Sequence, residues 1–347
     1  MRPFYASRET YKAAPDVKAT ARDDARIDRA LATATKSVDD QLHWAHFDPQ
    51  VATRYFDYPN HSYAPAHRLW LDNQGLISLT SITSGGDTIN PASVLLEPVN
   101  EGPPFDRIEL NLDTSASFGG TTGRQRNIGI TGVWGYRNDE APAGALAAGL
   151  DNSVTGVDVT DVSAVGVGAL ITCESERMIV VGKGLLDSGQ NLGTDLAALQ
   201  NAETVNLTLG TAFPVGEVVT IDAERMLLVD IAGNNGLVKR GWDGSTLAAH
   251  TTGADIFVPR TLTVERGACG TTAVVHNTAT ALTVWTPPRL VESLCIAEAI
   301  TIVQQEQAAY GRTVGSQKNE RDAAGRGLTH IRNAAYTAHG RVRLGAV

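Results

Sequence analysis

Two phrases in the chain place a glutamate beside an arginine at the head of an apolar run. Residues 173–182 read CESERMIVVG and residues 221–230 read IDAERMLLVD, so Glu176-Arg177-Met178 and Glu224-Arg225-Met226 stand 48 positions apart. Such a pair could act as an acid and a base. A catalytic site is usually asymmetric, however, and is rarely duplicated with its neighbours. We therefore interpret each glutamate as an acceptor of backbone N–H groups at a turn, each arginine as covering the strand, and each methionine as core.

A second repeat follows at an offset of 26 residues. The phrase VKRGWDGSTLAAH begins at Val238, and VERGACGTTAVVH begins at Val264. The paired glycines are expected to supply turn positions with positive φ. The two histidines could bind a metal, but no second ligand stands at a metal-binding spacing, so turn capping is the favoured interpretation. The matched residues are Arg240, Gly241, Gly244 and His250 in the first copy, and Arg266, Gly267, Gly270 and His276 in the second.

The order of these half-repeats predicts a nested arrangement. Two copies of the first type are followed by two copies of the second, and IAGNNG (231–236) suits a hairpin turn between the inner pair. We predict one β-module at 191–257, inserted into an outer β-module made of 146–190 plus 258–285. Insertion at a loop tip costs little conformational entropy. The half that begins at Leu262 should then pair with the half that ends at Gly182.

The chain ends predict helices, and the region between 55 and 136 predicts short strands. Apolar residues recur every three or four positions after Thr20, in a helix that Asp16 or Thr20 could start and that Pro49 is expected to end. The same spacing recurs after Pro288 up to Gly311, and more weakly around Ile331. The predicted fold class is α+β. A small helical bundle with a short β-sheet is assigned to 1–145 plus 286–347, with the two nested modules inserted into it.

Composition narrows the classes of function. The 347 residues carry a formal net charge of -9, which argues against a protein that coats DNA. The stretch from Arg312 to Arg343 is an exception, with seven Arg and Lys against two acids, or about +5. Three isolated cysteines are expected to be reduced, and neither a signal peptide nor a membrane span is expected. No enzyme motif is found, so we expect no catalysis, no cofactor and no metal.

The order of these parts resembles the head-to-tail connector (adaptor, or head completion) proteins of long-tailed bacteriophages. ARDDARIDRALATATKSVDDQL is similar to the N-terminal helix of that family, and HRLWLDNQGLISLTSITSGGDTI to its strand pair. LLEPVNEGPPFDRIEL and NIGITGVWGY are similar to its next strands, and PPRLVESLCIAEAITIVQQEQAAYG to the helix that follows. The repeats at about 146–285 stand between sheet and helix. The likeness covers most of the chain, and it consists of strand and turn patterns.

This resemblance implies a structural protein of the virion neck that is assembled in the host cytoplasm. It implies a ring of twelve copies, a dodecamer, docked under the portal protein. The ring would receive a tail-side stopper or tail terminator protein, and genomic DNA would pass through its channel without sequence-specific binding. The basic C-terminal stretch would reach the portal. The residues assigned to that interface are Arg312, Lys318, Arg321, Arg326, Arg332, Tyr336, Arg341 and Arg343.

Two alternatives stay open at this point. One is another virion component, such as a tail-tube or capsid decoration protein, which would be β-dominated throughout. The other is a glycan-binding or hydrolytic protein whose β-modules do the work. Such a protein would need exposed aromatic side chains or paired carboxylates in a cleft, and Trp242 is the one aromatic of the repeats that could serve.

Overall fold

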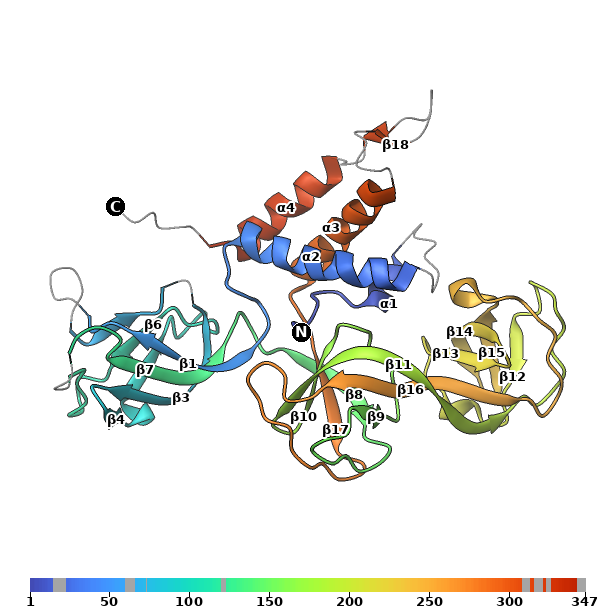
Figure 1. Ribbon diagram of the computed structural model, residues 1–347, viewed down its shortest axis with the longest axis horizontal. Helices are drawn as coiled ribbons and strands as arrows, with labels where there is room; N and C mark the ends of the chain where they lie inside the picture. Colours follow the sequence, from blue (N-terminus) through green and yellow to red (C-terminus); the bar gives the residue numbers. More distant parts are fainter. Residues whose placement is uncertain are drawn as a thin grey trace.

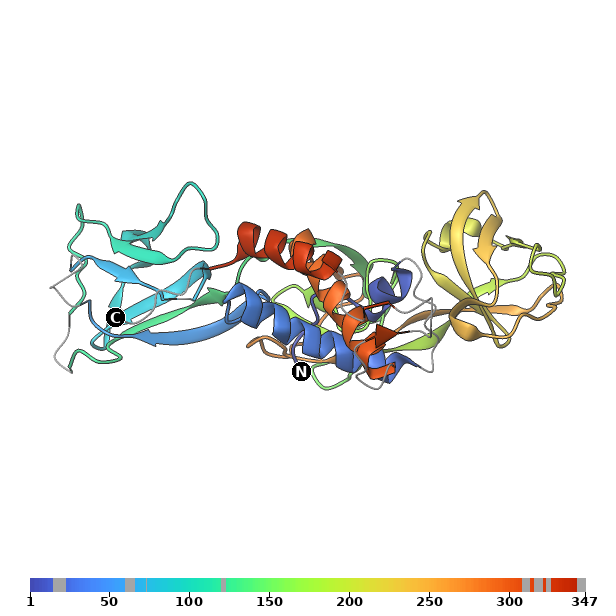
Figure 2. The ribbon, with the colours of Figure 1, turned by 90° about the horizontal axis from the view of Figure 1, so that it is seen from above.

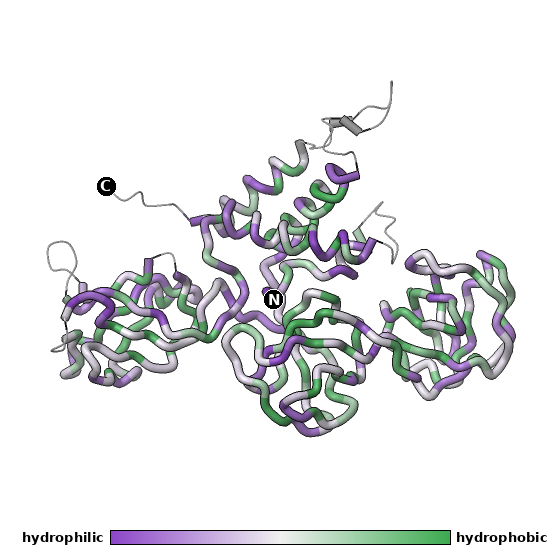
Figure 3. The backbone as a smooth tube through the Cα atoms, in the orientation of Figure 1, coloured by the Kyte–Doolittle hydropathy of each residue, from purple (hydrophilic) through white to green (hydrophobic). Residues whose placement is uncertain are grey.

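Three β units lie in a row, and a helical layer covers the middle of that row (Figures 1 and 2). The computed structural model describes residues 1–14, 23–59, 66–72, 74–119, 123–307, 313–314, 321–322 and 326–341. We call the three β units the small-sheet unit, the outer module and the nested module. Each has its own hydrophobic core, and apolar stretches occur in all three units (Figure 3).

The helical layer is built from both ends of the chain. Ser7 caps the first helix by accepting the backbone N–H of Thr10 at 3.1 Å. The longer second helix buries Ile27 and Leu31, at the spacing of one helical face, against the third helix. The described helices are α1 (Arg8–Ala13), α2 (Asp24–Leu42), α3 (Arg289–Gln307) and α4 (Arg326–His339).

The ends of these helices differ in part from those that periodicity predicted. Helix α2 ends at Leu42 instead of near Pro49, because His43 takes a left-handed conformation with φ of 58°. The two predicted starts, Asp16 and Thr20, and the predicted end of the third helix at Gly311 lie outside the described residues. Residues 313–314 and 321–322 form a short strand pair, β18 (Thr313–Val314) with β19 (Arg321–Asp322), between α3 and α4.

The small-sheet unit is two antiparallel sheets that enclose one core. Alternation of buried and exposed positions directs Ile82, Ile108, Ile128 and Trp134 inward. The first sheet has the order β1 (Gln50–Phe56), β7 (Ile128–Trp134), β3 (Leu76–Ser84) and β4 (Asp87–Ile89), and the second has the order β2 (Arg68–Trp70), β6 (Arg107–Leu110) and β5 (Val94–Glu97).

The outer and nested modules share one ten-stranded sheet. Two long strands, β11 (Glu176–Asn191) and β16 (Asp255–Glu265), run through both modules as an antiparallel ribbon with three register shifts. The other strands are β8 (Glu140–Ala145), β9 (Gly156–Asp158), β10 (Leu170–Cys173) and β17 (Ala281–Trp285) in the outer module, and β12 (Thr204–Asn206), β13 (Val218–Ile221), β14 (Glu224–Ala232) and β15 (Asn235–Lys239) in the nested module.

The strand pairing confirms the predicted link across the inserted module. Lys183 pairs with Leu262 and Gly182 with Thr263, although some eighty positions separate them in the chain. The two modules also repeat their register. Met178 faces Ile171 across β11 and β10, and Met226 faces Val219 across β14 and β13, 48 positions later in each case.

The predicted fold class, a small helical bundle with a short β-sheet, was wrong. The protein is mostly β and only 22% helical, and is not a helical bundle with a small sheet. Long amphipathic helices give strong sequence signals, whereas each strand here is short and counts for little by itself. The continuity of ten strands comes from pairings between distant segments, which periodicity does not register. The helical layer and the small-sheet unit also have separate cores, and β8 already belongs to the sheet of the outer module.

The N-terminal segment joins the helical layer to the outer module. Phe4 donates its backbone N–H to the carbonyl of Gly168 at 2.8 Å, and its ring covers that glycine. The buried hydroxyl of Tyr5 donates to Asp39 on α2 at 2.6 Å and accepts the N–H of Phe47 at 2.7 Å. Residues 1–14 therefore act as a strap between the two bodies.

Substitutions at two equivalent glycines of the repeats would measure how much the contact between the strap and the outer module contributes to stability. Gly168 and Gly216 both have φ of +92°, but a Cβ at Gly168 would lie 2.0 Å from the Phe4 ring, whereas one at Gly216 would meet nothing within 4 Å. Gly216→Ala should cost about 1 kcal/mol for backbone strain alone. Gly168→Ala should cost about 2–4 kcal/mol, because overpacking is added to that strain. Urea denaturation measures both values, and equal losses would show that the Phe4 contact is unimportant.

Candidate functional site

A buried carboxylate organises the outer module. Glu176 begins β11, and its side chain is completely buried. Arg266 grips it with both arms of the guanidinium, from Nε to Oε1 at 2.6 Å and from Nη2 to Oε2 at 2.7 Å. The backbone N–H groups of Gly267 and Val274 each donate to it at 3.0 Å. One carboxylate thus connects the start of a strand to a loop about ninety residues away.

A histidine completes this cluster from the other side. His276 Nε2 lies 3.0 Å from Glu176 Oε2, and its Nδ1 lies 2.8 Å from Glu174 Oε2. A neutral ring can donate to only one of these carboxylates, whereas the doubly protonated ring donates to both. The histidine therefore binds two carboxylates and not a turn alone. The two acids reach it through space, which sequence spacing did not indicate.

The nested module repeats the same cluster. Arg240 donates to Glu224 from Nε at 2.7 Å and from Nη2 at 2.8 Å. The N–H of Gly241 donates to Glu224 at 3.0 Å and that of Ala248 at 2.9 Å. His250 lies 3.0 Å from Glu224 through Nε2 and 2.7 Å from Asp222 through Nδ1. Every contact of the first cluster has its counterpart in the second.

The arginines also hold the loops around each cluster. Arg266 donates to the carbonyls of Asp151, Val154 and Val274, at 2.7 to 2.9 Å. Arg240 donates to the carbonyls of Ala197, Ala202 and Ala248, at 2.6 to 3.1 Å. These bonds provide donors to backbone carbonyl groups in irregular loops, where the regular hydrogen bonds of a helix or sheet are missing.

Electrostatics favours the ionised glutamates. Burial by itself would raise the pKa of Glu176, but the hydrogen bonds from Arg266, Val274, His276 and Gly267 outweigh burial and hold it at about 2. The pKa of Glu224 is likewise lowered to about 2, because bonds from Arg240, Ala248, His250 and Gly241 outweigh its burial. The oxygens of both carboxylates accept hydrogen bonds from these partners, and both side chains are buried from solvent. The arrangement therefore fixes loops and does not present a reacting group to a substrate.

The adjacent Glu-Arg pairs do not form ion pairs with each other. Successive side chains of a strand point to opposite faces, so Arg177 and Arg225 leave their neighbouring glutamates. Arg177 is buried and donates to Asn138 at 3.1 Å. Arg225 is more exposed and pairs with Asp243 at 2.6 Å.

The four glycines of the second repeat lie in left-handed turns. Their φ values are 60° and 77° at Gly241 and Gly244, and 61° and 78° at Gly267 and Gly270. In each loop the central residue is left-handed as well, Asp243 at 56° and Cys269 at 53°. These turns bring two backbone N–H groups back toward the buried glutamate.

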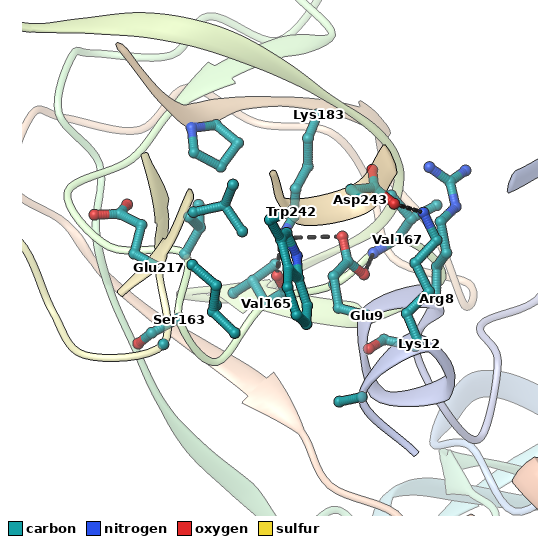
Figure 4. Close-up of a pocket in the computed structure, with 18 of the residues that line it drawn as sticks. Arg8, Glu9, Lys12, Ser163, Val165, Val167, Lys183, Glu217, Trp242 and Asp243 are labelled. Carbon is teal, nitrogen blue, oxygen red and sulfur yellow. Dashed lines mark hydrogen bonds and ion pairs between the residues drawn. The ribbon is translucent and has the colours of Figure 1, made fainter. Parts of the chain in front are cut away.

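A cleft of about 610 Å³ lies between helix α1, the outer module and the nested module (Figure 4). Its walls are mixed, with apolar side chains such as Val165 and Leu185 and a rim of charged ones. Trp242 projects into it, and Lys183 lies 3.3 Å from Glu9 on its edge. The carboxylates of the two buried clusters do not line this cleft.

The predicted C-terminal interface falls into three groups. Arg332 donates to Glu298 on α3 at 2.7 and 3.0 Å, and Arg341 lies over the Trp44 ring at 3.5 Å. Tyr336 is 41% exposed and packs edge-on against His43. Arg321 and Arg326 are described for their backbone alone. Arg312, Lys318 and Arg343 lie outside the described residues.

Sequence reasoning missed the partners of the glutamates. Arg240 and Arg266 were recognised as matching residues but not as the guanidinium groups of the clusters, and Asp222 and Glu174 were not singled out. A usable signal was present, because each repeated glutamate has a repeated Arg-Gly further along the chain. A buried carboxylate needs a cation, and this requirement could have joined the two repeats.

Comparisons with protein-family models, with curated proteins and with solved structures find no match for this chain. Among the described residues, no helix has the length and apolar character needed to cross a membrane. The described part of the chain also contains no group of three or more His, Cys, Asp or Glu residues placed to hold a metal ion.

Replacing one cluster carboxylate should destabilise its own module. Glu224→Gln leaves Arg240 buried without its counter-charge, and breaking a buried pair in this way costs about 3–5 kcal/mol. Because the nested module has its own core, we expect it to unfold first while the small-sheet unit stays folded. Glu176→Gln should act in the same way on the outer module. Urea denaturation measures the free energy of unfolding of each variant, and residue-resolved hydrogen exchange shows which module loses protection first. Unchanged stability in both variants would contradict a structural role for the glutamates.

Acid should weaken both modules before it weakens the small-sheet unit. A carboxyl whose pKa is lower when folded than when unfolded stabilises the fold above the unfolded value, and this stabilisation is lost as pH falls. For Glu176 and Glu224 that window runs from about pH 4.5 down to about 2. Hydrogen exchange at a series of pH values should show loss of protection in the modules over this range. In the Glu224→Gln variant, the nested module should lose this part of its acid sensitivity.

Proposed function

We propose that this protein is a structural component of a bacteriophage neck, a head-to-tail adaptor that forms a ring under the portal protein. In this role it would extend the DNA channel and receive a tail-side neck protein. The proposal assigns it no catalytic activity, no cofactor and no metal. It rests first on the order of helices, strands and inserted repeats that resembles this class of protein.

The observation that carries the proposal is the construction of the helical layer. Helices α2 and α3 come from opposite ends of the chain and pack on each other, while the β units between them extend to both sides (Figure 1). A subunit of this kind could pack against its neighbours through the central layer while its modules project. Closed rings of identical subunits need such a repeated surface.

The described surface of α2 indicates which of its residues could contact a neighbouring subunit in a ring. The alanines at Ala30 and Ala34 are buried inside the subunit and are not available to a neighbour. The outward side of α2 carries Ala32 and Thr33 between the charged residues Arg29 and Lys36. A ring contact through this helix would therefore be largely polar.

The mostly β architecture also supports a second candidate. A tail-tube or capsid decoration protein was expected to be β-dominated, and the continuous ten-stranded sheet has that character. The helical layer distinguishes the two candidates, because it serves a purpose in an adaptor and has none that we can assign in a decoration protein.

Mixing the purified protein with the portal protein of the same phage tests the proposal. An adaptor should form a symmetric ring on the portal, visible by electron cryomicroscopy and measurable by mass photometry. A protein that ignores the portal and instead binds capsid or tail-tube proteins would support the second candidate and overturn the first.

Charge reversal tests the basic C-terminal stretch more cleanly than a deletion from Arg312. A deletion would remove α4, whose Ala335 is fully buried and whose His339 carbonyl accepts the Trp44 indole N–H at 2.7 Å. A triple variant, Lys318→Glu, Arg321→Glu and Arg343→Glu, should weaken portal binding at least tenfold with stability unchanged. Lys36→Glu on α2 changes a surface charge elsewhere and should leave the portal affinity intact.

A further inference from the structure

Equivalent loops of the two modules make different contacts with the rest of the molecule. In the outer module, the carbonyl of Cys269 accepts the N–H of Val51 at 2.8 Å. Gly270 lies so close that a Cβ there would stand 2.0 Å from the Val51 carbonyl oxygen. This loop is thus joined to β1 through packed backbone, and that joint has no freedom to open without losing both contacts.

In the nested module, Asp243 occupies the position that Cys269 has in the outer module. Its contact with the body of the protein is an ion pair, from Lys12 Nζ on α1 to Asp243 Oδ1 at 2.6 Å. Lys12 also lies 2.5 Å from Asp24 at the start of α2, and Asp24 has a second partner in Arg8 at 3.2 Å. Arg225 holds Asp243 from within the nested module at 2.6 Å. The two ions of the contact are mostly buried, with 11% and 13% of their side chains exposed.

The covalent link to this module is narrow and irregular. The nested module continues from the outer one through β11 and β16, and their pairing shifts register at Val180–Gly182, Gly184–Leu186 and Asp187–Gln190. Such bulges bend and twist a ribbon locally. The cleft described above lies beside this ribbon, so the two modules are not packed tightly together there (Figure 4).

We propose that Lys12 and Asp243 form an electrostatic latch that holds the nested module against α1, and that the module swings on the β11–β16 ribbon when the latch is released. The opening would widen the cleft and expose Val165, which is buried in the closed arrangement, together with more of the ring of Trp242. A second ion pair, Lys183 with Glu9, joins α1 to the outer-module part of β11 and does not reach the nested module. The ion pair that joins the ribbon to the nested module is Arg260 with Glu217, with both bonds at 2.7 Å, so the module has to turn about this contact. The latch does not depend on the connector function.

Single-molecule energy transfer measures the latch directly in the full chain. Dyes are placed on cysteines at Lys36 of α2 and Leu199 of the nested module, which are both well exposed, in a Cys269→Ser background. Cys173 and Cys295 are buried. We expect Lys12→Met to enlarge the low-transfer, open population by roughly three- to tenfold at low salt. Because this pair is mostly buried, salt screens it weakly, so raising sodium chloride from about 50 to 500 mM should open the unsubstituted latch much less than Lys12→Met does.

Two variants separate the latch from a general loss of stability. Arg225→Met removes another partner of Asp243 but leaves Lys12 in place, so the closed population should persist. Lys12→Arg keeps the charge and should restore closure. The proposal is overturned if Lys12→Met shows the closed distribution at every salt concentration, or if Arg225→Met opens the module as much as Lys12→Met does.

Discussion

The buried glutamate at the head of a strand is the constraint on which both modules depend. A carboxylate taken out of water must be fully paired, and here two N–H groups, one guanidinium and one imidazole do this. These partners come from a loop that starts about ninety residues later in the outer module. In the nested module they come from a loop sixteen to twenty-six residues later. The same set of bonds thus closes a long excursion of the chain in one case and a short one in the other.

This difference explains how one module can sit inside another. The contacts of Glu176 require only that the fold brings Arg266 and His276 next to it. They do not restrict the length or structure of the chain segment between Glu176 and Arg266. The nested module fills that interval and closes on its own glutamate, Glu224. The two strands of the ribbon then carry the pairing from one module into the next, which joins them in a single sheet without merging their cores.

The contacts between bodies vary more than the contacts within them. The hydrogen bonds of the Glu176 cluster are repeated in the Glu224 cluster, but the loops beside the two clusters make different contacts. In the outer module Cys269 contacts β1, and in the nested module Asp243 contacts α1. A left-handed residue at the tip of each loop keeps the turn, while its side chain is free to change. The repeated framework therefore supplies stability, and the variable tip decides what each module docks against and how firmly.

The sequence by itself determined the repeats, the nesting and the long helices, because each is written as a local pattern or as a match at constant offset. It indicated the pairing of Gly182 with Thr263, and it indicated that Glu176 and Glu224 had the same role. It did not determine that the protein is mostly β, since short strands gain their sheet from partners far away in the chain. Only the tertiary structure decided that Arg266 and Arg240 neutralise the glutamates, and that Glu174 and Asp222 reach the histidines. Those are contacts through space between loops. The repeated Arg-Gly indicates a cation for each glutamate, but spacing along the chain does not determine which side chains meet in the folded protein.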